Sequence, residues 1–442
     1  MNLTLLAYAL IIVFMALIMT KRLSVLTALI LLPILFGLLG GFGAALGPMM
    51  LDGVRAIAPT GVMLAFAILY FGLMIDVGLF EPIVRVVVRL VDGDPVKTVV
   101  GTAVLALTVS LDGDGSTTYL IVTAAMLPLY QRLGLSRLVL ACVIMLSGGI
   151  MNLLPWGGPT ARVAAALKLD MNALFVPLIT PMVFGSAWVV FVAWRLGLRE
   201  RRRLELAGAG GSETPAKPVP DAKEDDGAIP RSHRLFWFNA VLTLALMSAL
   251  VAGLLPLPVL FMVACAIALA VNYPDLAQQR ERVAAHAGNA LAVAGVVFAA
   301  GVFTGILSGT RMIDAMAQSV ITIVPESLGP HLAVITAVLS APFTFFISND
   351  AFYYGVVPVL AEAASHYGIS AVEIGRASLA GQPVHLLSPL VPSTYLLVGL
   401  CGVELGDHQK FTLKWALGST LVLLAISLLS AVIPLAGRAV GP

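Results

Sequence analysis

Two short polar segments interrupt long apolar stretches of this chain. The first, residues 110–118, contains Asp112 and Asp114, and the second, residues 348–350, reads Ser-Asn-Asp. A carboxylate at the centre of a bilayer costs roughly 2.5–3.5 kcal/mol even on the most lenient insertion scale, so acidic residues at that depth usually serve a substrate, an ion or a proton. Because one such segment occurs in each half of the chain, the pattern indicates a duplicated transport protein.

The composition places most of the chain in a lipid bilayer. Of 442 residues, 59% are hydrophobic and only 11% are charged, whereas a soluble domain carries about 25% charge. The predicted fold class is therefore an all-α polytopic membrane protein. A net charge of +2 gives no reason to expect nucleic acid as a partner. The three cysteines, Cys142, Cys265 and Cys401, match no metal or disulfide spacing and are expected to pack in apolar surroundings.

The hydropathy pattern predicts ten full spans and two hairpins. The spans are expected at 3–20, 23–46, 60–80, 135–167, 173–194, 235–253, 256–273, 287–308, 369–402 and 412–436. Segments 95–131 and 329–366 have apolar arms around a polar centre. Each arm of ~15 residues would be ~22 Å long, which is short for a ~30 Å hydrocarbon core. Both segments are therefore predicted to be re-entrant hairpins.

The distribution of charge predicts the topology. If both hairpins are re-entrant, the Arg- and Lys-rich loops share one face, which the positive-inside rule assigns to the cytoplasm of a cell membrane. Residues 199–233, rich in Gly, Pro, Lys, Glu and Asp, are predicted to be a disordered cytoplasmic linker, with both termini outside. The linker separates repeats 1–198 and 234–442. Five crossings per repeat would place the two repeats in opposite orientations, an arrangement typical of secondary transporters with a site near the midplane.

Two of the expected spans, 135–167 and 369–402, are interrupted by glycine and proline. Such breaks free backbone groups that lipid cannot satisfy, so they are tolerated where they line a cavity. The N-terminal ends of half-helices there present N–H donors and a partial positive charge to carboxylates. A packing kink is the alternative interpretation of either break. The residues expected to bind substrate at the breaks are Asn152, Trp156, Gly157, Gly158, Thr160, Gln382 and Ser388.

Arg162 follows the first break by two residues. Its guanidinium could pair with a substrate carboxylate through two parallel hydrogen bonds. It could equally extend toward the outer interface of the membrane. His385 lies inside the second break, and its imidazole titrates near neutrality in principle. It is a candidate for proton coupling, although a buried structural role is equally compatible with the sequence.

The first hairpin tip is suited to a cation. Asp112 and Asp114 alternate with glycines that allow tight turns and close approach of the backbone. The hydroxyls of Ser116, Thr117 and Thr118 add oxygen ligands or donors, and these three residues are expected to bind substrate. Oxygen ligands of this kind suit Mg²⁺ or Ca²⁺. A solvated loop is the alternative, and the apolar arms on both sides argue against it.

The second tip mixes donors with one carboxylate. Ser348 and Asn349 are expected to bind substrate carboxylates, and Asp350 is expected to hold a metal ion or a proton. Together with Asp112 and Asp114, Asp350 completes the predicted set of metal ligands and of acidic proton-coupling candidates.

Paired tips and breaks in two inverted halves resemble the ion transporter superfamily, which includes the divalent anion:sodium symporters. Residues 110–118, 152–162, 348–353 and 381–389 most resemble the citrate–metal:proton symporter family (CitMHS), over nearly the whole chain except the linker. The resemblance implies symport of citrate complexed with a divalent metal and coupled to protons. It also implies a homodimer in which a transport domain moves like an elevator against a fixed scaffold.

A charge argument agrees with this resemblance. Free citrate is a trianion near neutral pH, and a site with several carboxylates repels it by about 4 kcal/mol per close pair at an effective dielectric constant of 20. A divalent cation between them reverses the sign. The metal, Mg²⁺ or Ca²⁺, would be part of the transported complex, and no permanently bound cofactor is expected.

Four alternatives remain open at this point, and one of them is a channel, although channels seldom need broken helices together with two hairpins. A sodium-coupled carrier of di- or tricarboxylates and a proton antiporter of the same superfamily would use the same fold. An intramembrane hydrolase could use Asp112 and Asp114 as an aspartic dyad, but no second catalytic motif accompanies them. The chain is therefore expected not to be an enzyme.

Overall fold

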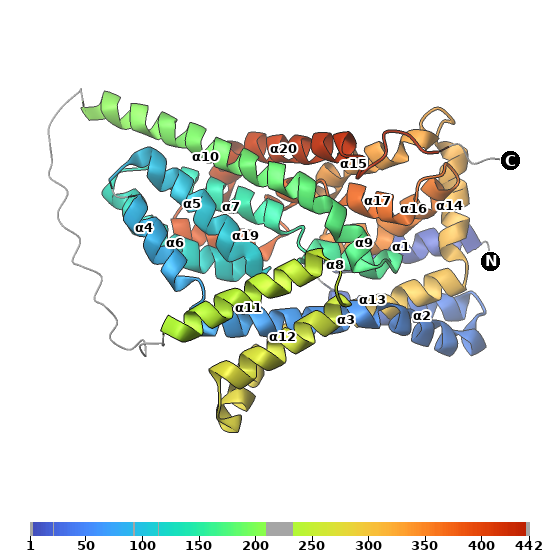
Figure 1. The fold of residues 1–442 in the computed structure, drawn as a ribbon. Helices are drawn as coiled ribbons and strands as arrows, with labels where there is room; N and C mark the ends of the chain where they lie inside the picture. Colours follow the sequence, from blue (N-terminus) through green and yellow to red (C-terminus); the bar gives the residue numbers. More distant parts are fainter. Residues whose placement is uncertain (1–2, 21, 92, 114, 209–232, 439–442) are drawn as a thin grey trace.

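A computed structural model describes residues 3–20, 22–91, 93–113, 115–208 and 233–438, which form helices and turns and no strands (Figure 1). The helices of the first half are α1 (Leu3–Met19), α2 (Val25–Leu39), α3 (Leu46–Asp76), α4 (Glu81–Leu90), α5 (Pro95–Val109), α6 (Gly115–Arg132), α7 (Arg137–Met151), α8 (Gly158–Leu167), α9 (Met171–Phe175) and α10 (Ile179–Gly208). Those of the second half are α11 (His233–Val251), α12 (Leu257–Asn272), α13 (Leu276–Gly309), α14 (Met312–Ile323), α15 (Leu332–Phe346), α16 (Val357–Ser365), α17 (Ala371–Ser378), α18 (Gln382–His385), α19 (Pro392–Cys401) and α20 (Leu405–Leu429). Short 3₁₀ turns are η1 (Gly43–Ala45), η2 (Ser110–Asp112), η3 (Val176–Leu178) and η4 (Gly329–His331), and η5 (Ala351–Val356) is a π turn.

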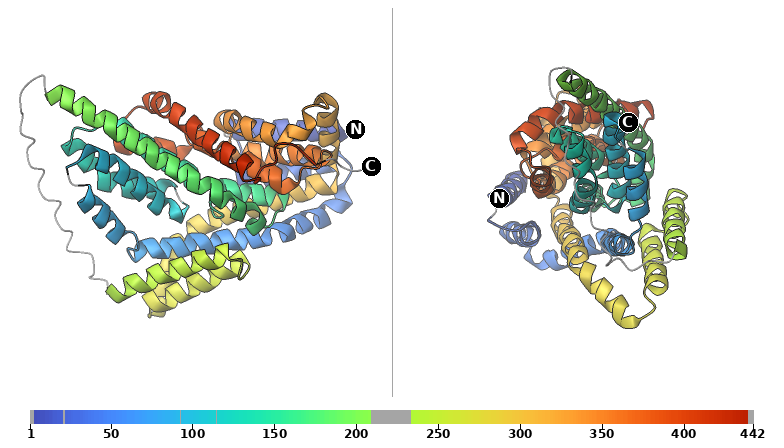
Figure 2. Two further views of the ribbon diagram at one scale, coloured as in Figure 1. Left: turned by 45° about the horizontal axis from the view of Figure 1, so that its top comes forward. Right: turned by 90° about the vertical axis from the view of Figure 1, so that its left-hand side faces the viewer.

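Long helices lie on two sides of the molecule, with shorter helices between them. In Figure 1, α3 and α13 run along the lower side with α11 and α12 outside them, and α10 and α20 run along the upper side. In the right-hand view of Figure 2, α11 and α12 lie side by side at the edge of the molecule. The centre is apolar, and almost every residue of α7 from Val139 to Met151 is buried. This core positions the hairpins and breaks that the sequence singled out.

Seven helical segments of the described chain are long and apolar enough to cross a membrane. They are Gly43–Asp76, Pro95–Asp112, Met171–Leu206, Arg234–Val251, Leu276–Gly309, Gly329–Phe346 and Leu405–Leu429. Five shorter apolar helices accompany them: Leu3–Ile18, Val25–Leu39, Arg137–Met151, Leu257–Asn272 and Pro392–Cys401. Two of the seven, Pro95–Asp112 and Gly329–Phe346, are first arms of the expected hairpins, so the number of full spans stays a prediction. The all-helical membrane class is confirmed.

Several predicted boundaries were wrong. The third span was expected from residue 60, but α3 begins at Leu46 and carries Pro59 inside it, because neighbouring helices can satisfy the backbone groups that a proline frees. The span expected at 287–308 is continuous with the preceding polar segment in α13. The linker was expected from residue 199, but α10 continues to Gly208, because Arg, Glu and Leu favour helix. The remainder of the predicted linker, 209–232, lies outside the described residues.

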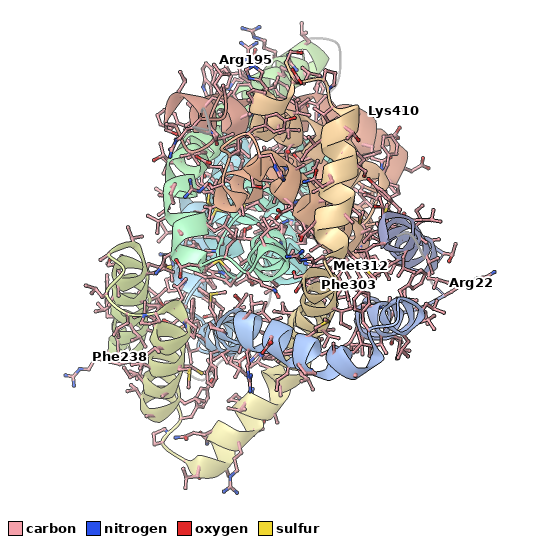
Figure 3. All side chains as sticks on the ribbon, turned by 90° about the vertical axis from the view of Figure 1, so that its right-hand side faces the viewer. Arg22, Arg195, Phe238, Phe303, Met312 and Lys410 are labelled. Carbon is pink, nitrogen blue, oxygen red and sulfur yellow. The ribbon has the colours of Figure 1, made fainter. Side chains whose placement is uncertain are left out.

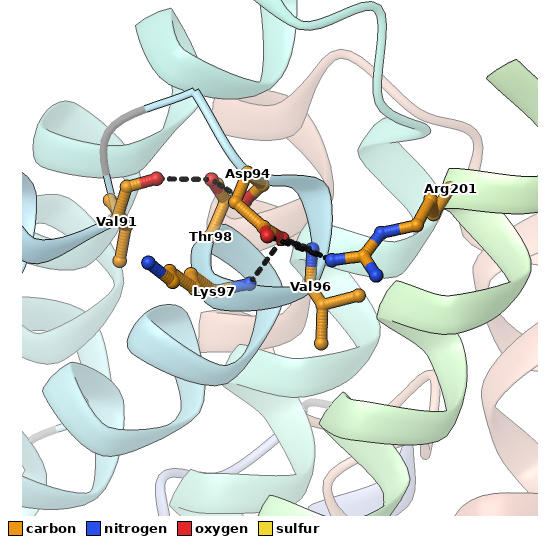
Figure 4. A network of polar contacts seen from close by, with 6 residues as sticks. All are labelled: Val91, Asp94, Val96, Lys97, Thr98 and Arg201. Carbon is orange, nitrogen blue, oxygen red and sulfur yellow. Dashed lines mark hydrogen bonds and ion pairs between the residues drawn. The ribbon is translucent and has the colours of Figure 1, made fainter. Parts of the chain in front are cut away.

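The extended end of α10 is tied to the start of α5 (Figure 4). Asp94 is the N-cap residue of α5, where its Oδ1 accepts hydrogen bonds from the backbone N–H of Val96 at 2.7 Å and of Lys97 at 3.2 Å. Arg201 donates to both oxygens of the same carboxylate, at 2.8 and 2.7 Å. This contact fixes the polar end of α10 against the first hairpin and accounts for helix beyond residue 199.

Apolar side chains cover the outer helices. On α11, Trp237, Val241 and Leu244 are more than half exposed, and Figure 3 shows Phe238 of the same helix pointing away from the body. Exposure on this scale is expected where a helix faces lipid or another apolar surface. Cys142, Cys265 and Cys401 are buried and form no disulfide, in agreement with their expected packing role.

Candidate functional site

A cavity of about 710 Å³ opens between the long helices and the hairpins. One side, which we call the long-helix wall, is formed by Ile68, Phe71, Gly72 and Ile75 of α3 and by His286, Asn289, Ala292, Val293, Val296 and Val297 of α13. The other side, which we call the hairpin wall, is formed by Asp112, Gly113, Ser116, Thr117, Trp156, Gly158, Ala161, Arg162 and Tyr354. The volume is in the range of small-molecule sites in proteins.

The first tip lies on the hairpin wall. The chain leaves α5 through η2, reverses at Gly113 with φ of +78°, and starts α6 at Gly115. Asp112 is buried and lines the cavity. Ser116 and Thr117, in the first turn of α6, line it as well. Asp114 lies outside the described residues, so its predicted role as a metal ligand or proton carrier stays a prediction.

Trp156 of the first break holds this tip in place. Its Nε1–H donates to the backbone oxygen of Leu111 at 2.9 Å. A Cβ atom on Gly113 would lie 2.4 Å from Cδ1 of the same indole, so a glycine is required there both for the left-handed backbone and for space. The ring also packs against Phe71 and Phe261, with centroids 5.2 Å apart in each case. The indole therefore connects the first tip, the first break and the long-helix wall.

The first break brings a helix N-terminus to the cavity. After α7 ends at Met151, the chain turns and Gly157 takes an extended conformation as the N-cap residue of α8. Gly158, Ala161 and Arg162, at spacings of three and four, place one face of α8 on the cavity. Backbone N–H groups of the first turn and the Arg162 guanidinium thus lie near each other, which favours an anionic ligand.

The second tip is joined to α8 by an ion pair. The chain leaves α15, passes through Ser348, Asn349 and Asp350, and enters η5. Nε of Arg162 donates to Oδ1 of Asp350 at 2.6 Å, and the two side chains are 28% and 14% exposed. Oγ of Ser348 accepts from the backbone N–H of Ala351 at 3.2 Å. Arg162 therefore lies on the cavity wall with its guanidinium turned to Asp350, which favours the substrate-binding alternative over an extension toward the outer interface.

A chain of amide hydrogen bonds links the two breaks. Nδ2 of Asn152 donates to Oε1 of Gln382 at 3.0 Å. Nε2 of Gln382 donates in turn to the hydroxyl of Tyr353 at 2.6 Å and to Oδ1 of Asn349 at 3.3 Å. Gln382 is fully buried. The sequence predicted each of Asn152, Asn349 and Gln382 as a binding residue, and the structure brings them together behind the cavity rather than on its lining.

A small cavity of about 80 Å³ lies behind the first tip, where Thr118 and Asn152 line it together. Three other predicted residues lie away from both cavities, with their side chains bonded to backbone. Thr160 Oγ1 donates to Leu153 O at 2.9 Å, Ser388 Oγ donates to Phe345 O at 2.6 Å, and Nδ1 of His385 lies 2.7 Å from Thr344 O. These contacts suit residues that hold irregular backbone in place.

The ion pair between Arg162 and Asp350 occupies one of the three predicted metal ligands. Among the described residues, no three His, Cys, Asp or Glu side chains come together as a metal-binding group. Asp350 faces the Arg162 guanidinium at 2.6 Å, and a neighbouring cation of this kind already compensates its charge. Asp112 is the carboxylate that lines the cavity in the part of the chain the structure describes.

Comparison with known proteins decides the family. A family model described as "Citrate transporter" (CitMHS) matches residues 14–381. The chain belongs to this citrate transporter family. Two relatives from Bacillus subtilis (strain 168) support the assignment: a "Citrate transporter", 59% identical over 98% of this chain and 99% of its own length, and a "Mg(2+)/citrate complex secondary transporter", 53% identical over 97% and 98%. The expected resemblance is confirmed, as is the expectation of a transporter rather than an enzyme.

Solved structures share the fold of this citrate transporter family member at low identity. The Alcanivorax borkumensis YdaH transporter superposes with a TM-score of 0.64 at 16% identity, covering 99% of this chain and 100% of that one. Neisseria gonorrhoeae MtrF superposes with a TM-score of 0.62 at 13% identity, covering 91% and 88%. Both are transporters by name.

Sequence reasoning missed the long-helix wall of the CitMHS site. Phe71, His286 and Asn289 line the cavity, yet their segments looked like ordinary spans. His286 and Asn289 lie in the same helix as a long apolar run, and two polar residues three positions apart in such a helix were the available signal.

Proposed function

We propose that this protein transports citrate across the cell membrane as a complex with a divalent metal ion, coupled to protons. The observation that carries the proposal is the mixture of charge on the hairpin wall, where Asp112 and Arg162 line the same cavity. A carboxylate alone would repel citrate, and an arginine alone would not favour a metal ion. A metal–citrate complex presents both charges.

The donors and acceptors divide between the two parts of such a cargo. Asp112, with the hydroxyls of Ser116 and Thr117, offers oxygen ligands of the kind that Mg²⁺ and Ca²⁺ prefer. Arg162 and the N-terminus of α8 offer N–H donors to citrate carboxylates. The metal is cargo in this scheme. The name of the magnesium–citrate relative and the family description support this choice of cargo.

We further infer two inverted repeats, 1–198 and 234–442, each with a re-entrant hairpin and a broken span. In each half a helix–turn–helix segment is followed by an interrupted one. The cavity between the long-helix wall and the hairpin wall suits an elevator movement of one against the other, and a homodimer would anchor the fixed part. The arginines at the end of α10 support, by the positive-inside rule, a cytoplasmic position for that end of the helix and an outside position for both termini.

Uptake into proteoliposomes tests the cargo and the coupling. We expect labelled citrate to enter when Mg²⁺ or Ca²⁺ is present, with an inward proton gradient and without Na⁺, and to stop entering when the metal is chelated. Asp112→Asn should abolish metal-dependent uptake while the protein still inserts. Asp52→Asn, at a side chain 73% exposed and paired with Arg55, is the matched control. Citrate uptake that is driven by Na⁺ and does not depend on Mg²⁺ or Ca²⁺ would contradict the proposal and favour a sodium-coupled carrier.

A further inference from the structure

The long-helix wall of the cavity carries a histidine–carboxylate pair. Nε2 of His286, on α13, lies 2.8 Å from Oδ2 of Asp76, the last residue of α3. The two side chains are 20% and 22% exposed, and His286 lines the cavity together with Asn289. An ionised carboxylate only accepts hydrogen bonds, so this contact assigns the Nε2–H as the donor to Asp76 and leaves Nδ1 as the second nitrogen of the ring.

Gly72 makes the place for the imidazole ring. A Cβ atom at position 72 would lie 2.6 Å from Nδ1 and 2.7 Å from Cγ of His286. Such contacts are far inside van der Waals distance, so any larger residue would displace the ring from the wall. Gly72 itself lines the cavity. The glycine on α3 and the carboxylate four residues later thus hold one histidine of α13 in a defined orientation.

The histidine that the sequence suggested for proton coupling lies elsewhere. His385 is 6% exposed, its Nδ1 is 2.7 Å from Thr344 O, and it does not line the cavity. Of the histidines in the described chain, His286 is the one on the cavity wall. Its access to the cavity makes it the better placed of the two to exchange a proton while cargo is bound.

We propose that His286, positioned by Asp76 and Gly72, binds a carboxylate of the anionic cargo in its protonated form and is one of the groups that couple cargo to protons. This inference rests on the proposed function. A carboxylate has no proton to donate, so it cannot form a hydrogen bond with the lone pair on Nδ1 of the neutral ring. When a proton bonds to that lone pair, the ring gains one positive charge and Nδ1–H becomes a donor. The same proton leaves as H⁺ when the cargo has gone.

The surrounding charges are compatible with both protonation states. Nη1 of Arg282, one turn before His286 on α13, is 3.8 Å from the same Asp76 oxygen and is itself paired with Glu281. Arg282 therefore partly compensates Asp76 when the imidazole is neutral. The charged and titratable groups that the structure records near the ring are Asp76 on α3 and Arg282 on α13, and the same cavity is also lined by Asp112, Arg162 and Tyr354.

The dependence of cargo affinity on pH tests the proposal. His286→Gln retains an amide donor for Asp76 but cannot gain a proton. Citrate uptake with Mg²⁺ into proteoliposomes is measured at about pH 6 and about pH 8, on either side of the ordinary histidine pKa of about 6.5. We expect the half-saturation concentration of the variant to be roughly tenfold higher than that of the wild type at the lower pH, and nearly equal at the higher pH. The ionisation of citrate and its binding of Mg²⁺ also change with pH, but they change equally in both assays, so they cancel in the ratio of the variant's half-saturation concentration to that of the wild type.

Two further variants separate position from chemistry. Gly72→Ala leaves the imidazole intact but displaces it, and it should reproduce the pH pattern of His286→Gln. His366→Gln, at an exposed histidine at the end of α16, is the matched control and should behave as the wild type. A His286→Gln to wild-type ratio that is the same at both pH values would overturn the inference while leaving the proposed function standing. A wild-type protein that takes up no citrate would overturn both.

Proton binding gives a second readout that does not need transport. When Mg²⁺ and citrate are added to purified protein in weak buffer near neutral pH, the wild type should take up about one proton more than His286→Gln. Equal proton uptake by the two proteins would overturn the inference even where the variant transports too poorly to be assayed.

Discussion

Nε of Arg162 lies 2.6 Å from Oδ1 of Asp350, in an ion pair between residues 188 positions apart in the chain. The pair connects the helix that follows the first break to the second hairpin tip. Arg162 also lines the cavity. The positive charge that awaits an anionic cargo is thus shared with a carboxylate of the protein, and cargo binding has to redistribute it.

The first prediction concerns this pair. Arg162→Gln removes the guanidinium and leaves a mostly buried carboxylate that repels an anion, so it should weaken citrate binding. Asp350→Asn frees the guanidinium from its competing carboxylate, so it should strengthen citrate binding. Because the two residues are in contact, the double variant should differ from the sum of the single variants by about 0.5–3 kcal/mol in binding free energy. Isothermal titration of the purified variants measures the coupling. Additive effects would show that the two side chains act independently on the cargo.

The second prediction concerns Gly113. An alanine there needs the left-handed backbone and places its Cβ 2.4 Å from the indole of Trp156, so we expect a lower unfolding temperature, loss of about 1–3 kcal/mol of stability, and loss of citrate uptake. Gly41→Ala is a matched control, since Gly41 has φ of +84° but no atom within 4 Å of the added Cβ. Equal effects of the two changes would mean that backbone strain alone, and not the contact with Trp156, matters at the tip.

The third prediction concerns Gln382. Its removal in Gln382→Ala leaves Asn152 and Tyr353 without their partner in a buried place, and each unsatisfied group costs about 1–3 kcal/mol. Stability in detergent and affinity for magnesium–citrate should both fall. Gln318→Ala, at an exposed side chain beside His366, should change neither. Unaltered affinity in Gln382→Ala would remove the amide chain from any role in shaping the site.

The fourth prediction concerns pH and the contact in Figure 4. Partial burial acts to raise the pKa of Asp94, but the hydrogen bonds from Arg201, Lys97 and Val96 outweigh it, so the pKa lies below its ordinary value. Since the folded-state pKa is the lower one, the stabilisation is fully present above the unfolded value of about 3.9 and is lost as the pH falls through the folded pKa.

Asp94→Asn tests this dependence because asparagine still caps the helix. At neutral pH the variant should unfold at a lower temperature than the wild type, because it loses about 0.5–1 kcal/mol of unfolding free energy for a partly exposed pair. The difference should vanish in acid, below the folded pKa of Asp94. Asp170→Asn, at an N-cap bonded to Ala173 N, is the control. A difference that persists at low pH would assign the effect to capping rather than to charge.

Hydropathy and helix-breaking residues predicted much of the fold. The helix ends at Met151 and restarts at Gly158, and the second interruption lies between Ser378 and Pro392, within ranges that glycine and proline marked in the sequence. Helix boundaries near polar residues were less predictable. Arg199–Leu206 looked like a linker because it is charged, but the contact between Arg201 and Asp94 stabilises helix there, and a contact over 107 positions leaves no local signal.

The candidate site was predictable on one side only. The costly carboxylates at the first tip pointed to Asp112, and the first helix break pointed to Trp156 and Arg162; all three line the cavity. The long-helix wall is built mainly from apolar residues of α3 and α13, and their cavity side differs from a lipid-facing side only in what packs against it. The ion pair between Arg162 and Asp350 was also beyond sequence reasoning, since each residue alone suggested a direct contact with cargo.

The hydrogen bond between Asn152 and Gln382 has a consequence for how such proteins diverge. A change at either amide leaves the other without its hydrogen-bond partner in a largely buried place, so lineages that alter one should alter its counterpart soon afterwards. The two positions are therefore expected to co-vary among homologous sequences more strongly than either does with its own neighbours in the chain. Exchange of one half of the gene between distant relatives should fail unless this amide pair travels intact.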